Sequence, residues 1–430
     1  MKRVIVVGGG FAGLTASVYL AENNFEVTLL EASPKLGGRA YSLYNQKFDD
    51  YYDNGQHILM GCYEETLLFL KKINSTENIE FQNSLKVPFV QKGGGIVKLS
   101  SYKKFYPLNL LFGMLNFKVL SIKERLKVID FFLDLMCCYS CDLKDKTVKD
   151  WLECKKQSAN TIKSFWEILV VGTLNTTIEK ASAEIFSEVL QRIFLNGNKA
   201  ATIVLPKTSL EKFYVENANH FIKTNNGKII LSESVDRIEI KNNKILKIET
   251  GNKSYSDFDF VIMALPDYAI KKIMSDSNIV LDLPEFEYSP ILNVHLWLKE
   301  NPFKERFYGL IGSQIHWLFN HGKHISLTTS SAEFLINLDG SEIIRHFCSE
   351  IELYFPIFKT EMVIYSQVIK EKRATFIPNI ASTEKRKKIN LKFENFLFAG
   401  DWTNTGLPAT IESAVLSGRI AATQVMSSLK

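Results

Sequence analysis

Val4-Ile5-Val6-Val7-Gly8-Gly9-Gly10-Phe11-Ala12-Gly13 lies at the start of this 430-residue chain and carries its clearest structural signal. The β-branched run 4–7 predicts a short buried strand of a parallel sheet. The glycines that follow fit the pattern G-x-G-x-x-G, and residues 14–22 predict a helix that ends at Asn23-Asn24. Residues 26–30 (EVTLL) predict a second strand, with Glu31 at its end. This order predicts a Rossmann-type βαβ unit and an α/β fold.

Each residue type in this unit has a physical task. The first glycine permits a tight turn, the second lets the backbone approach a pyrophosphate, and the third allows close packing of helix on strand. The helix N-terminus presents free amides and the positive end of its dipole to phosphates. The acid at the end of the second strand accepts hydrogen bonds from ribose hydroxyls. We therefore predict dinucleotide contacts from Gly8, Gly10, Phe11, Ala12, Gly13 and Glu31.

Two further blocks favour FAD over NAD. Residues 34–39 (PKLGGR) form a second glycine-rich turn, and residues 395–399 (NFLFA) predict another buried strand. That strand runs into Gly400-Asp401, a loop, and a predicted helix over 410–427. An acid at a strand end followed by a helix N-terminus can hold ribityl or phosphate groups and the isoalloxazine edge. The predicted contacts of FAD in these blocks are Gly38, Arg39, Gly400, Asp401, Ala409 and Thr410.

Composition sets outer bounds on the function. A formal net charge of +5 is too mild to indicate nucleic-acid binding, which requires a concentrated basic patch. The uncharged run 4–21 superficially resembles a signal peptide, but the glycine spacing of the βαβ unit explains it better. The six cysteines (Cys62, Cys137, Cys138, Cys141, Cys154 and Cys348) lack a zinc-site spacing, so we expect no metal and reduced thiols in a reducing compartment.

The chain resembles the flavin amine oxidase and phytoene desaturase superfamily, and most closely its hydroxysqualene dehydroxylase branch. The blocks that carry the likeness to the branch are Asp53-Asn54-Gly55-Gln56-His57 with residues 61–64, and residues 400–414 (GDWTNTGLPATIESA). Ser413 and Asn404 depart from residues often found in the branch, and Ser413 is expected to crowd the helix turn near the flavin. The resemblance spans essentially the whole chain and adds Gly55 to the expected flavin contacts.

The resemblance also implies an activity and a domain plan. Members of the branch use reduced FAD to replace the hydroxyl of hydroxysqualene, a polyisoprenoid, with hydrogen, and a reduced nicotinamide or another donor recharges the flavin. We expect an amine-oxidase-like fold with a discontinuous FAD-binding domain made of residues 1–90, 205–270 and 393–430. An inserted α+β substrate domain would comprise residues 91–204 and 271–392. Within the first domain, residues 229–240, 244–249 and 258–265 are predicted strands.

Residues 102–139 are rich in large apolar side chains interspersed with lysines. One interpretation is a pair of amphipathic helices that pack against a domain core. The other is a lip that dips into the bilayer interface and lets a water-insoluble triterpene enter, with the lysines on anionic headgroups. We accordingly expect a cytoplasmic enzyme that, under the second interpretation, attaches peripherally to the inner face of the cytoplasmic membrane.

Loss of a hydroxyl requires a proton donor. His57 is the first candidate because imidazole titrates near neutral pH, with bracing of the backbone or flavin as the alternative. Glu412 is the second, and its alternative is an acid favoured by a helix dipole. Asp53 is expected to cap a loop, and His295 to pack in a strand. Rival functions are a carotenoid-type desaturase or isomerase, an amine oxidase with Trp402 and Trp317 framing the amine, and a non-catalytic FAD-bearing lipid carrier.

Overall fold

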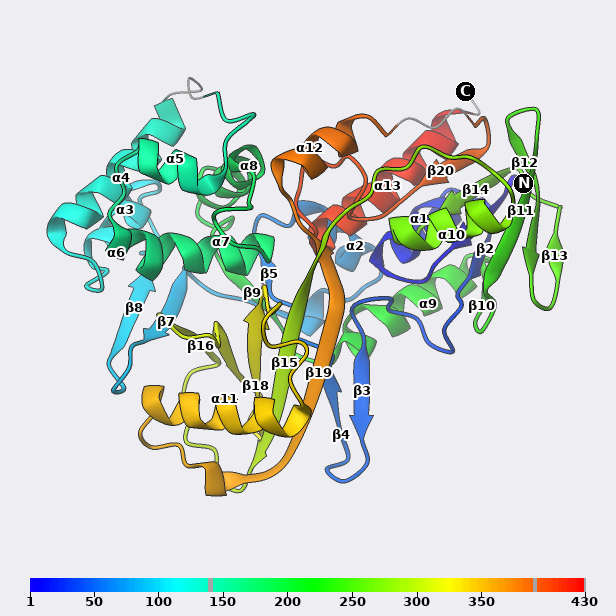
Figure 1. Cartoon of the computed structure of the whole chain (residues 1–430). Coiled ribbons are helices and arrows are strands. Elements are labelled where there is room, and N and C mark those ends of the chain that lie inside the picture. Colours follow the sequence, from blue (N-terminus) through cyan, green and yellow to red (C-terminus); the bar gives the residue numbers. More distant parts are fainter. Residues whose placement is uncertain (138–141, 390–392, 429–430) are drawn as a thin grey trace.

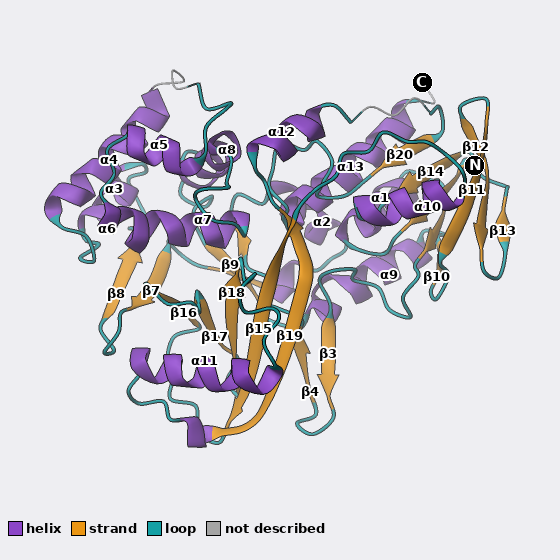
Figure 2. Cartoon of the chain, viewed as in Figure 1, coloured by secondary structure: helices purple, strands orange, loops and turns teal. Residues whose placement is uncertain are grey.

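The computed structural model describes residues 1–137, 142–389 and 393–428, and it divides into two sheets and a helical lobe (Figures 1 and 2). The five-stranded sheet contains strands from both the N-terminal and the C-terminal parts of the chain, and the seven-stranded sheet lies below it in Figure 1. Cys138 and Cys141 of the cysteine cluster lie outside the described residues. In the described part of the chain, no helix has both the length and the apolar character needed to cross a bilayer.

The βαβ unit predicted from the opening sequence is confirmed. Strand β1, helix α1 and strand β2 span Arg3–Val7, Phe11–Glu22 and Glu26–Leu30. Strands β1 and β2 pair in parallel within a sheet of order β10-β2-β1-β14-β20, and all of its pairings are parallel. The other three strands are Lys228–Ile230 (β10), Phe260–Met263 (β14) and Phe396–Phe398 (β20).

Helix α1 packs against the C-terminal helix α13 (Ile411–Ser427). The approach is close, because a Cβ added to Gly418 would lie 2.2 Å from the carbonyl oxygen of Ala12. Strand β20 and helix α13 are joined by the 400–410 loop, so that loop reaches the carboxyl edge of the sheet next to β1 and β14. Ligands bind at this edge in open parallel sheets. The other helices of this half are α2 (Glu64–Lys72), α9 (Glu216–Thr224) and α10 (Asp267–Asp276), with a π-helical turn at Glu211–Val215.

The predicted strand over 229–240 is broken into two. Strand β10 ends at Ile230, and Val235–Lys241 (β11) pairs with Lys244–Thr250 (β12) in a separate small sheet with Ser254–Tyr255 (β13). Between β10 and β11, Ser232 has a φ of +54°, and its amide donates to the carbonyl oxygen of Ser33. This turn takes the chain off the edge of the parallel sheet, a long-range event that local alternation of residues does not signal.

The seven-stranded sheet has the order β19-β15-β18-β17-β16-β7-β8, and helix α11 (Gly340–Tyr354) lies across it in Figure 1. Its strands are Lys86–Val90 (β7), Ile96–Ser100 (β8), Tyr288–Leu298 (β15), Phe307–Leu310 (β16), Trp317–Asn320 (β17), His324–Ser330 (β18) and Val363–Phe376 (β19). Strand β7, which the domain plan places in the first domain, pairs with β8 and β16 of this sheet.

The helical lobe, at the upper left of Figure 1, contains the apolar segment 102–137. Its helices are α3 (Leu108–Leu115), α4 (Ile122–Cys137), α5 (Val148–Cys154), α6 (Ala159–Thr161), a π-helical turn (Ile162–Trp166), α7 (Glu167–Leu174) and α8 (Ala183–Phe194). Small sheets link the parts: Ser42–Asn45 (β3) with Asp50–Asp53 (β4), and Leu59–Met60 (β5) with Ile203–Pro206 (β9) and Ile79–Phe81 (β6). Helix α12 (Ile380–Lys387) lies between the lobe and the parallel sheet.

Candidate FAD site

A cavity of about 640 Å³ begins at the glycine turns and extends between the two sheets into the helical lobe. Its first end is backbone-rich and polar, formed by the turns after β1 and β2 and by the 400–410 loop. Its other end is apolar, with walls from β7, β8, α7 and α8. One cavity therefore contains both a phosphate-suited part and an apolar part. The predicted residues that line it are Gly8, Gly10, Phe11, Ala12, Glu31, Gly38, Arg39, Gly55, His57, Gly400, Asp401, Ala409 and Thr410.

Two predicted residues, Gly13 and Glu412, are not among the residues that line the cavity. Gly13 has the packing role expected of the third glycine, because a Cβ there would lie 1.8 Å from the carbonyl oxygen of Gly8. Gly13 thus supports the turn from behind, and its direct contact with FAD stays a prediction. Gly8 has a φ of +105°, and a Cβ there would lie 2.5 Å from the carbonyl oxygen of Ala264, so glycine is required.

The two glycine turns lie against each other. The amide of Gly37 donates to the carbonyl oxygen of Gly9 over 2.9 Å, and a Cβ on Gly38 would lie 3.0 Å from the Cα of Gly10. Helix α1 has Gly10 at its N-cap, without a side-chain cap and without an acid in its first turn. Its first amides are thus left for an anion, and the cradle fits the pyrophosphate of FAD.

Glu31 braces this cradle from the end of β2. One carboxylate oxygen accepts from the amide of Gly9 over 2.6 Å, and the other accepts from the amide of Ser33 over 2.8 Å. A carboxylate has about four lone-pair sites, so Glu31 can still accept from ribose hydroxyls while it holds the turn. The predicted ribose contact remains a prediction, and the structure adds a bracing role.

Arg39 and Asp401 join the second glycine turn to the 400–410 loop. The guanidinium donates to the Asp401 carboxylate over 2.6 Å and to the carbonyl oxygen of Ala374 over 3.0 Å. Burial alone would lower the pKa of Arg39, but the adjacent Asp401 carboxylate outweighs it and the pKa is raised. Gly400 has a φ of +151°, and a Cβ there would lie 2.7 Å from Nε1 of Trp402. The loop can therefore bend toward the cavity only with glycine at this position.

Tyr214 is a structural residue of the site that sequence reasoning missed. Its hydroxyl lies 2.9 Å from the carbonyl oxygen of Gly37 and 2.7 Å from that of Ala40, and its ring stacks on Phe11 with centroids 3.8 Å apart. One buried side chain thus holds the second glycine turn against the start of α1. Because Tyr214 is about 175 residues from these partners in the chain, no local pattern could have identified it.

Arg386 on α12 is the second missed residue. It is 2% exposed and donates to the carbonyl oxygens of Asp401, Trp402, Thr403 and Leu407 and to the hydroxyl of Thr405. Burial lowers its pKa to about 10, so the side chain stays cationic at neutral pH. In the sequence, Arg386 lies within the basic run KRKK, which is typical of a solvated helix face.

Ser413 does not crowd the helix turn, contrary to the expectation from the sequence. Its hydroxyl lies 3.1 Å from the carbonyl oxygen of Asp401 and 2.7 Å from the hydroxyl of Thr405. The side chain is fully buried and adds hydrogen bonds to the 400–410 loop. The departure from glycine is thus accommodated, with the loop tied to α13.

Asn54 links the second glycine turn to the middle of the cavity. It donates to the carbonyl oxygen of Arg39 over 2.9 Å, and its own carbonyl oxygen accepts from the Asn293 amide over 3.1 Å. His57 Nε2 lies 3.2 Å from the side-chain oxygen of Asn54. Burial lowers the pKa of His57 to about 4, so the ring is neutral at pH 7.

Asp53 caps a loop, as predicted. Its carboxylate accepts from the Ser42 hydroxyl over 2.7 Å and from the amide of Leu210 over 3.0 Å. Burial raises the pKa of Asp53 to about 6 despite these bonds.

Glu412 lies at a helix N-terminus, as in the alternative role of an acid that is favoured by a helix dipole. Its carboxylate accepts from the amides of Glu65 and Thr66, over 3.0 and 2.9 Å, and from the Thr66 hydroxyl over 2.7 Å. These are groups of the first turn of α2, so Glu412 caps that helix from α13. Burial raises the pKa of Glu412, and its role as a proton donor stays a prediction.

Glu371 on β19 is a cavity-lining acid that the sequence did not reveal. Burial raises the pKa of Glu371, with the charge of Arg39 acting in the opposite direction. A carboxylic acid of raised pKa in a cavity is a candidate general acid. Its position in a long alternating strand gives no signal that distinguishes it from an exposed glutamate.

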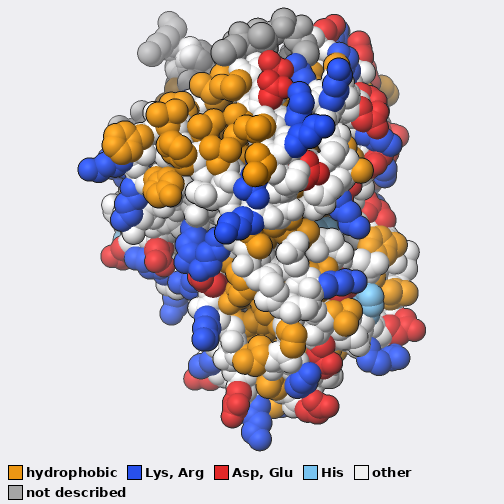
Figure 3. Space-filling view, turned by 90° about the vertical axis from the view of Figure 1, so that its left-hand side faces the viewer, with side chains coloured by type: hydrophobic (Ala, Val, Ile, Leu, Met, Phe, Trp, Pro, Cys, Tyr) orange, Lys and Arg blue, Asp and Glu red, His pale blue; other side chains and the backbone are white. Residues whose placement is uncertain are grey.

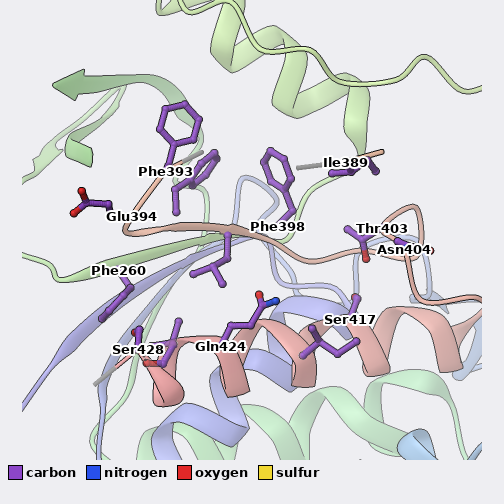
Figure 4. Close-up of a pocket in the computed structure, with 14 residues that line it drawn as sticks. Phe260, Ile389, Phe393, Glu394, Phe398, Thr403, Asn404, Ser417, Gln424 and Ser428 are labelled. Carbon is purple, nitrogen blue, oxygen red and sulfur yellow. Dashed lines mark hydrogen bonds between the residues drawn. The ribbon is translucent and has the colours of Figure 1, made fainter. Parts of the chain in front are cut away.

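A second, smaller cavity of about 380 Å³ lies between β20 and α13 (Figure 4). Gln424 and Ser417 line it from α13, while Phe398 lines it from β20 and Phe393 from the preceding segment. None of the residues predicted to act in binding or catalysis lines this cavity. We assign it no function.

The remaining histidines and cysteines form no alternative centre. His295 is 1% exposed and lies 2.9 Å from the Ser326 hydroxyl through Nδ1, so it packs as expected. Across residues 1–137, 142–389 and 393–428, no group of His, Cys, Asp and Glu has the arrangement of a metal site. Cys62, Cys154 and Cys348 are free thiols, and Cys154 is exposed rather than packed.

The chain is similar to proteins of known type over nearly its full length. It is 27% identical to the hydroxysqualene dehydroxylase of Zymomonas mobilis over 99% of this chain and 100% of that protein. It is 23% identical to the 15-cis-phytoene desaturase of Arabidopsis thaliana over 99% of this chain and 80% of that protein. A crystal structure of an oxidoreductase from Methanosarcina mazei superimposes with a TM-score of 0.76 at 17% identity, covering 99% and 100% of the two chains.

The family of flavin containing amine oxidoreductases matches residues 11–426. This span begins at Phe11, directly after Gly8-Gly9-Gly10, and it includes the second glycine turn, the 400–410 loop and nearly all of α13. The likeness to the solved structure supports the fold of this chain, in which a parallel five-stranded sheet stands beside a mixed seven-stranded sheet. The chain therefore belongs to the flavin containing amine oxidoreductase family and is an FAD-dependent oxidoreductase.

Proposed function

We propose that this enzyme carries out the reductive dehydroxylation of hydroxysqualene to squalene. The observation that carries the proposal is the cavity, which contains both a phosphate-suited part and an apolar part. The hydroxysqualene dehydroxylase of Zymomonas mobilis, alignable from end to end, supports the choice of substrate. The DNGQH and GDWTNTGLPATIE blocks, which resemble that branch, both contribute residues to the cavity wall.

The apolar end suits a hydrocarbon chain. Its wall is formed by apolar side chains on and next to β7, β8, α7 and α8, namely Leu85, Val87, Phe89, Leu99, Phe165, Ile168, Leu169, Ile193 and Phe194. Such walls offer burial of apolar surface and no hydrogen bond along most of their length, as a triterpene requires. They also exclude water from the place where the C–O bond breaks.

The reaction balances as alcohol plus hydride plus proton giving hydrocarbon plus water. FAD, when bound in its reduced form, supplies the hydride, and a reduced nicotinamide or another electron donor must restore it. The protein has to place the carbon that bears the hydroxyl and deliver one proton to the departing oxygen. Gly8, Gly10, Phe11, Ala12, Glu31, Gly38, Arg39, Gly55, Gly400, Asp401, Ala409 and Thr410 are the residues proposed to hold the cofactor.

His57 remains the proposed proton donor, since it lines the cavity beside Asn54. With a pKa near 4, about one ring in 1,000 is protonated at pH 7, so donation is favoured by acid. Glu371 is the competing donor because it lines the same cavity with a raised pKa. Variants of the two residues distinguish the two assignments.

Product analysis tests the proposed reaction. Purified enzyme would be reduced under anaerobic conditions in buffer made with deuterated water and then incubated with hydroxysqualene in detergent micelles. The extract would be analysed by mass spectrometry. We expect squalene that carries one deuterium atom per molecule. Recovery of unchanged hydroxysqualene by an enzyme that retains its flavin would refute the proposal.

Assays of the same enzyme with other substrates separate the rival reactions. Consumption of phytoene by the oxidised enzyme, with a longer polyene as product, would point to a desaturase, the type of the Arabidopsis relative. Release of hydrogen peroxide from amines would point to an amine oxidase. The latter has little structural support here, because Trp402 is buried against Phe286 and Phe398 and only Trp317 lines the cavity.

A further inference from the structure

The helical lobe exposes a concentration of large apolar side chains on α3, α4 and the loop before them. Their exposed fractions range from 45% at Met136 to 78% at Phe105. We call this set the α3–α4 patch; it consists of Tyr102, Phe105, Leu108, Phe112, Ile122, Leu126, Leu133 and Met136. Contiguous apolar surface of this kind on a water-exposed face marks an interaction site.

The patch is additional to the core-facing side of the same helices. On α4, Val128 and Phe131 are buried in the lobe and provide its packing. Ile122, Leu126, Leu133 and Met136 recur at the spacing of one helix face, yet they are 45–70% exposed. The inner face of α4 thus packs against the core of the lobe, which is the first interpretation of this segment. The outer face has no partner among the described residues and is available for the second interpretation, contact with a bilayer.

The charge around the patch is mainly positive, because residues 102–137 contain six Lys or Arg and three acids, Glu124, Asp130 and Asp134. Residues 102–123 contain four lysines, Lys103, Lys104, Lys118 and Lys123, and no acidic residue. All four lysines are exposed. Figure 3 shows the apolar side chains gathered on one part of this face with Lys and Arg side chains along its border. Apolar residues beside lysines complement an interface of acyl chains and anionic headgroups.

Neighbours of the patch residues contact the apolar end of the cavity wall. The hydroxyl of Tyr106, next to Phe105, donates to the carbonyl oxygen of Phe194 over 3.0 Å. The ring of Phe132 on α4 contacts the ring of Phe194, with centroids 5.1 Å apart. Phe194 lines the cavity, so a single layer of residues separates the cavity wall from the exposed segment.

We propose that the α3–α4 patch docks this enzyme on the surface of an anionic phospholipid bilayer. Docking would place the apolar end of the cavity next to the acyl chains, where a polyisoprenoid resides. The passage of substrate rests on the proposed function, whereas the docking itself does not. A bilayer is the favoured occupant because anionic headgroups complement Lys103, Lys104, Lys118 and Lys123 while acyl chains cover the apolar side chains beside them.

Vesicle co-sedimentation of the flavin-loaded enzyme tests the docking. We expect binding to phosphatidylglycerol–phosphatidylcholine vesicles, weakened by salt, and at least about 10-fold weaker binding to phosphatidylcholine alone. A Lys103→Ala/Lys104→Ala/Lys118→Ala variant should lose roughly fivefold per lysine. Equal, weak sedimentation with both kinds of vesicle would overturn the proposal.

A matched pair of variants isolates the apolar contribution. Phe105→Ser/Phe112→Ser/Leu126→Ser removes three patch residues, and Phe334→Ser/Leu353→Ser/Ile357→Ser removes three side chains of similar exposure elsewhere. We expect the first to lower vesicle affinity by at least about 10-fold and the second to leave it unchanged, with flavin content and thermal unfolding retained in both. An equal loss in both variants, or in neither, would contradict a specific patch.

The assay also separates this proposal from the proposed function. Vesicle binding without conversion of hydroxysqualene in micelles would retain the docking and reject the reaction. Conversion in micelles without vesicle binding would reject the docking and retain the reaction. A wild-type dimer in sedimentation velocity that the patch variant converts to monomer, with no vesicle binding by either, would assign the patch to a second copy and also reject the docking.

Discussion

At the scale of single residues, the site depends on side chains that hold glycine turns as much as on the glycines. Tyr214 illustrates this, since its hydroxyl serves two buried carbonyl oxygens of the second glycine turn. Tyr214→Phe keeps the ring stack on Phe11 but leaves those carbonyls without this donor. We expect the free energy of unfolding to fall by about 1–3 kcal/mol and the affinity of the apoenzyme for FAD to fall with it.

Urea unfolding and fluorescence titration with FAD measure the two effects. Tyr308→Phe is the matched control, because the Tyr308 hydroxyl accepts from the amides of Lys304 and Glu305, which do not line the cavity. It should lower stability without changing FAD affinity. An unchanged FAD affinity in Tyr214→Phe would remove Tyr214 from the support of the site.

His57 and Glu371 would both donate a proton more readily as pH falls, so it is variants of the two residues that separate them. If the imidazolium of His57 donates the proton, its fraction rises as pH falls toward its pKa of about 4. The value of kcat/KM should then increase about tenfold per pH unit on going from pH 7 to pH 5, because that parameter reports the free enzyme. His57→Gln should flatten this dependence and lower the rate at pH 5 by at least about 100-fold.

Steady-state kinetics from pH 5 to 8 on the wild type, His57→Gln and Glu371→Gln would decide between the two donors. Flavin absorbance of each variant confirms that the site is intact. A wild-type profile retained in His57→Gln but lost in Glu371→Gln would transfer the role to Glu371.

At the scale of elements, the 400–410 loop owes its shape to a helix that is not adjacent to it in the chain. Arg386 of α12 donates to four carbonyl oxygens of that loop. Arg386→Met should lower the free energy of unfolding by about 3 kcal/mol and weaken FAD binding, since buried carbonyls lose their donors. Lys387→Ala, on the same helix, removes only surface ion pairs and should cost at most about 1 kcal/mol.

Thermal and urea unfolding with FAD titration would compare these two variants of α12. Equal effects on FAD affinity would mean that the loop does not depend on Arg386.

How much the sequence could predict follows from the range of the interactions involved. The βαβ unit, Gly400-Asp401 and α13 were predictable because their signals are local: a β-branched run, glycines at fixed spacing, an acid at a strand end. The assignment of β7 to the seven-stranded sheet was not, since its partners β8 and β16 include a strand more than 200 residues away. Tyr214 and Arg386 were missed for the same reason.

At the scale of the whole molecule, two buried histidines of the seven-stranded sheet make stability depend on pH. Burial lowers the pKa of His295 to about 3 and that of His324 to about 4. As pH falls below about 6.5, the unfolded chain binds protons at these rings before the folded one does. The free energy of unfolding therefore keeps its full value with respect to these rings above pH 6.5 and falls as pH drops toward 4. At pH 5 the loss is about 2 kcal/mol per ring.

Urea unfolding at pH 7 and pH 5 checks this loss. The raised pKa of Asp53 acts in the opposite direction, so the wild type must be compared with His295→Asn/His324→Asn, which should lose less stability between the two pH values. The exposed His220→Asn variant is the control and should behave like the wild type. A double variant with the full wild-type loss would exclude these rings as the cause.

The central claim of this account is that the flavin gives a hydride to an allylic alcohol held in the apolar end of the cavity. Anaerobic spectrophotometry of the fully reduced enzyme tests it most directly. We predict that hydroxysqualene in micelles restores the yellow absorbance of oxidised FAD, with one squalene formed per flavin. Reduced enzyme that stays colourless with hydroxysqualene, while oxidised enzyme is bleached by phytoene, would contradict the claim.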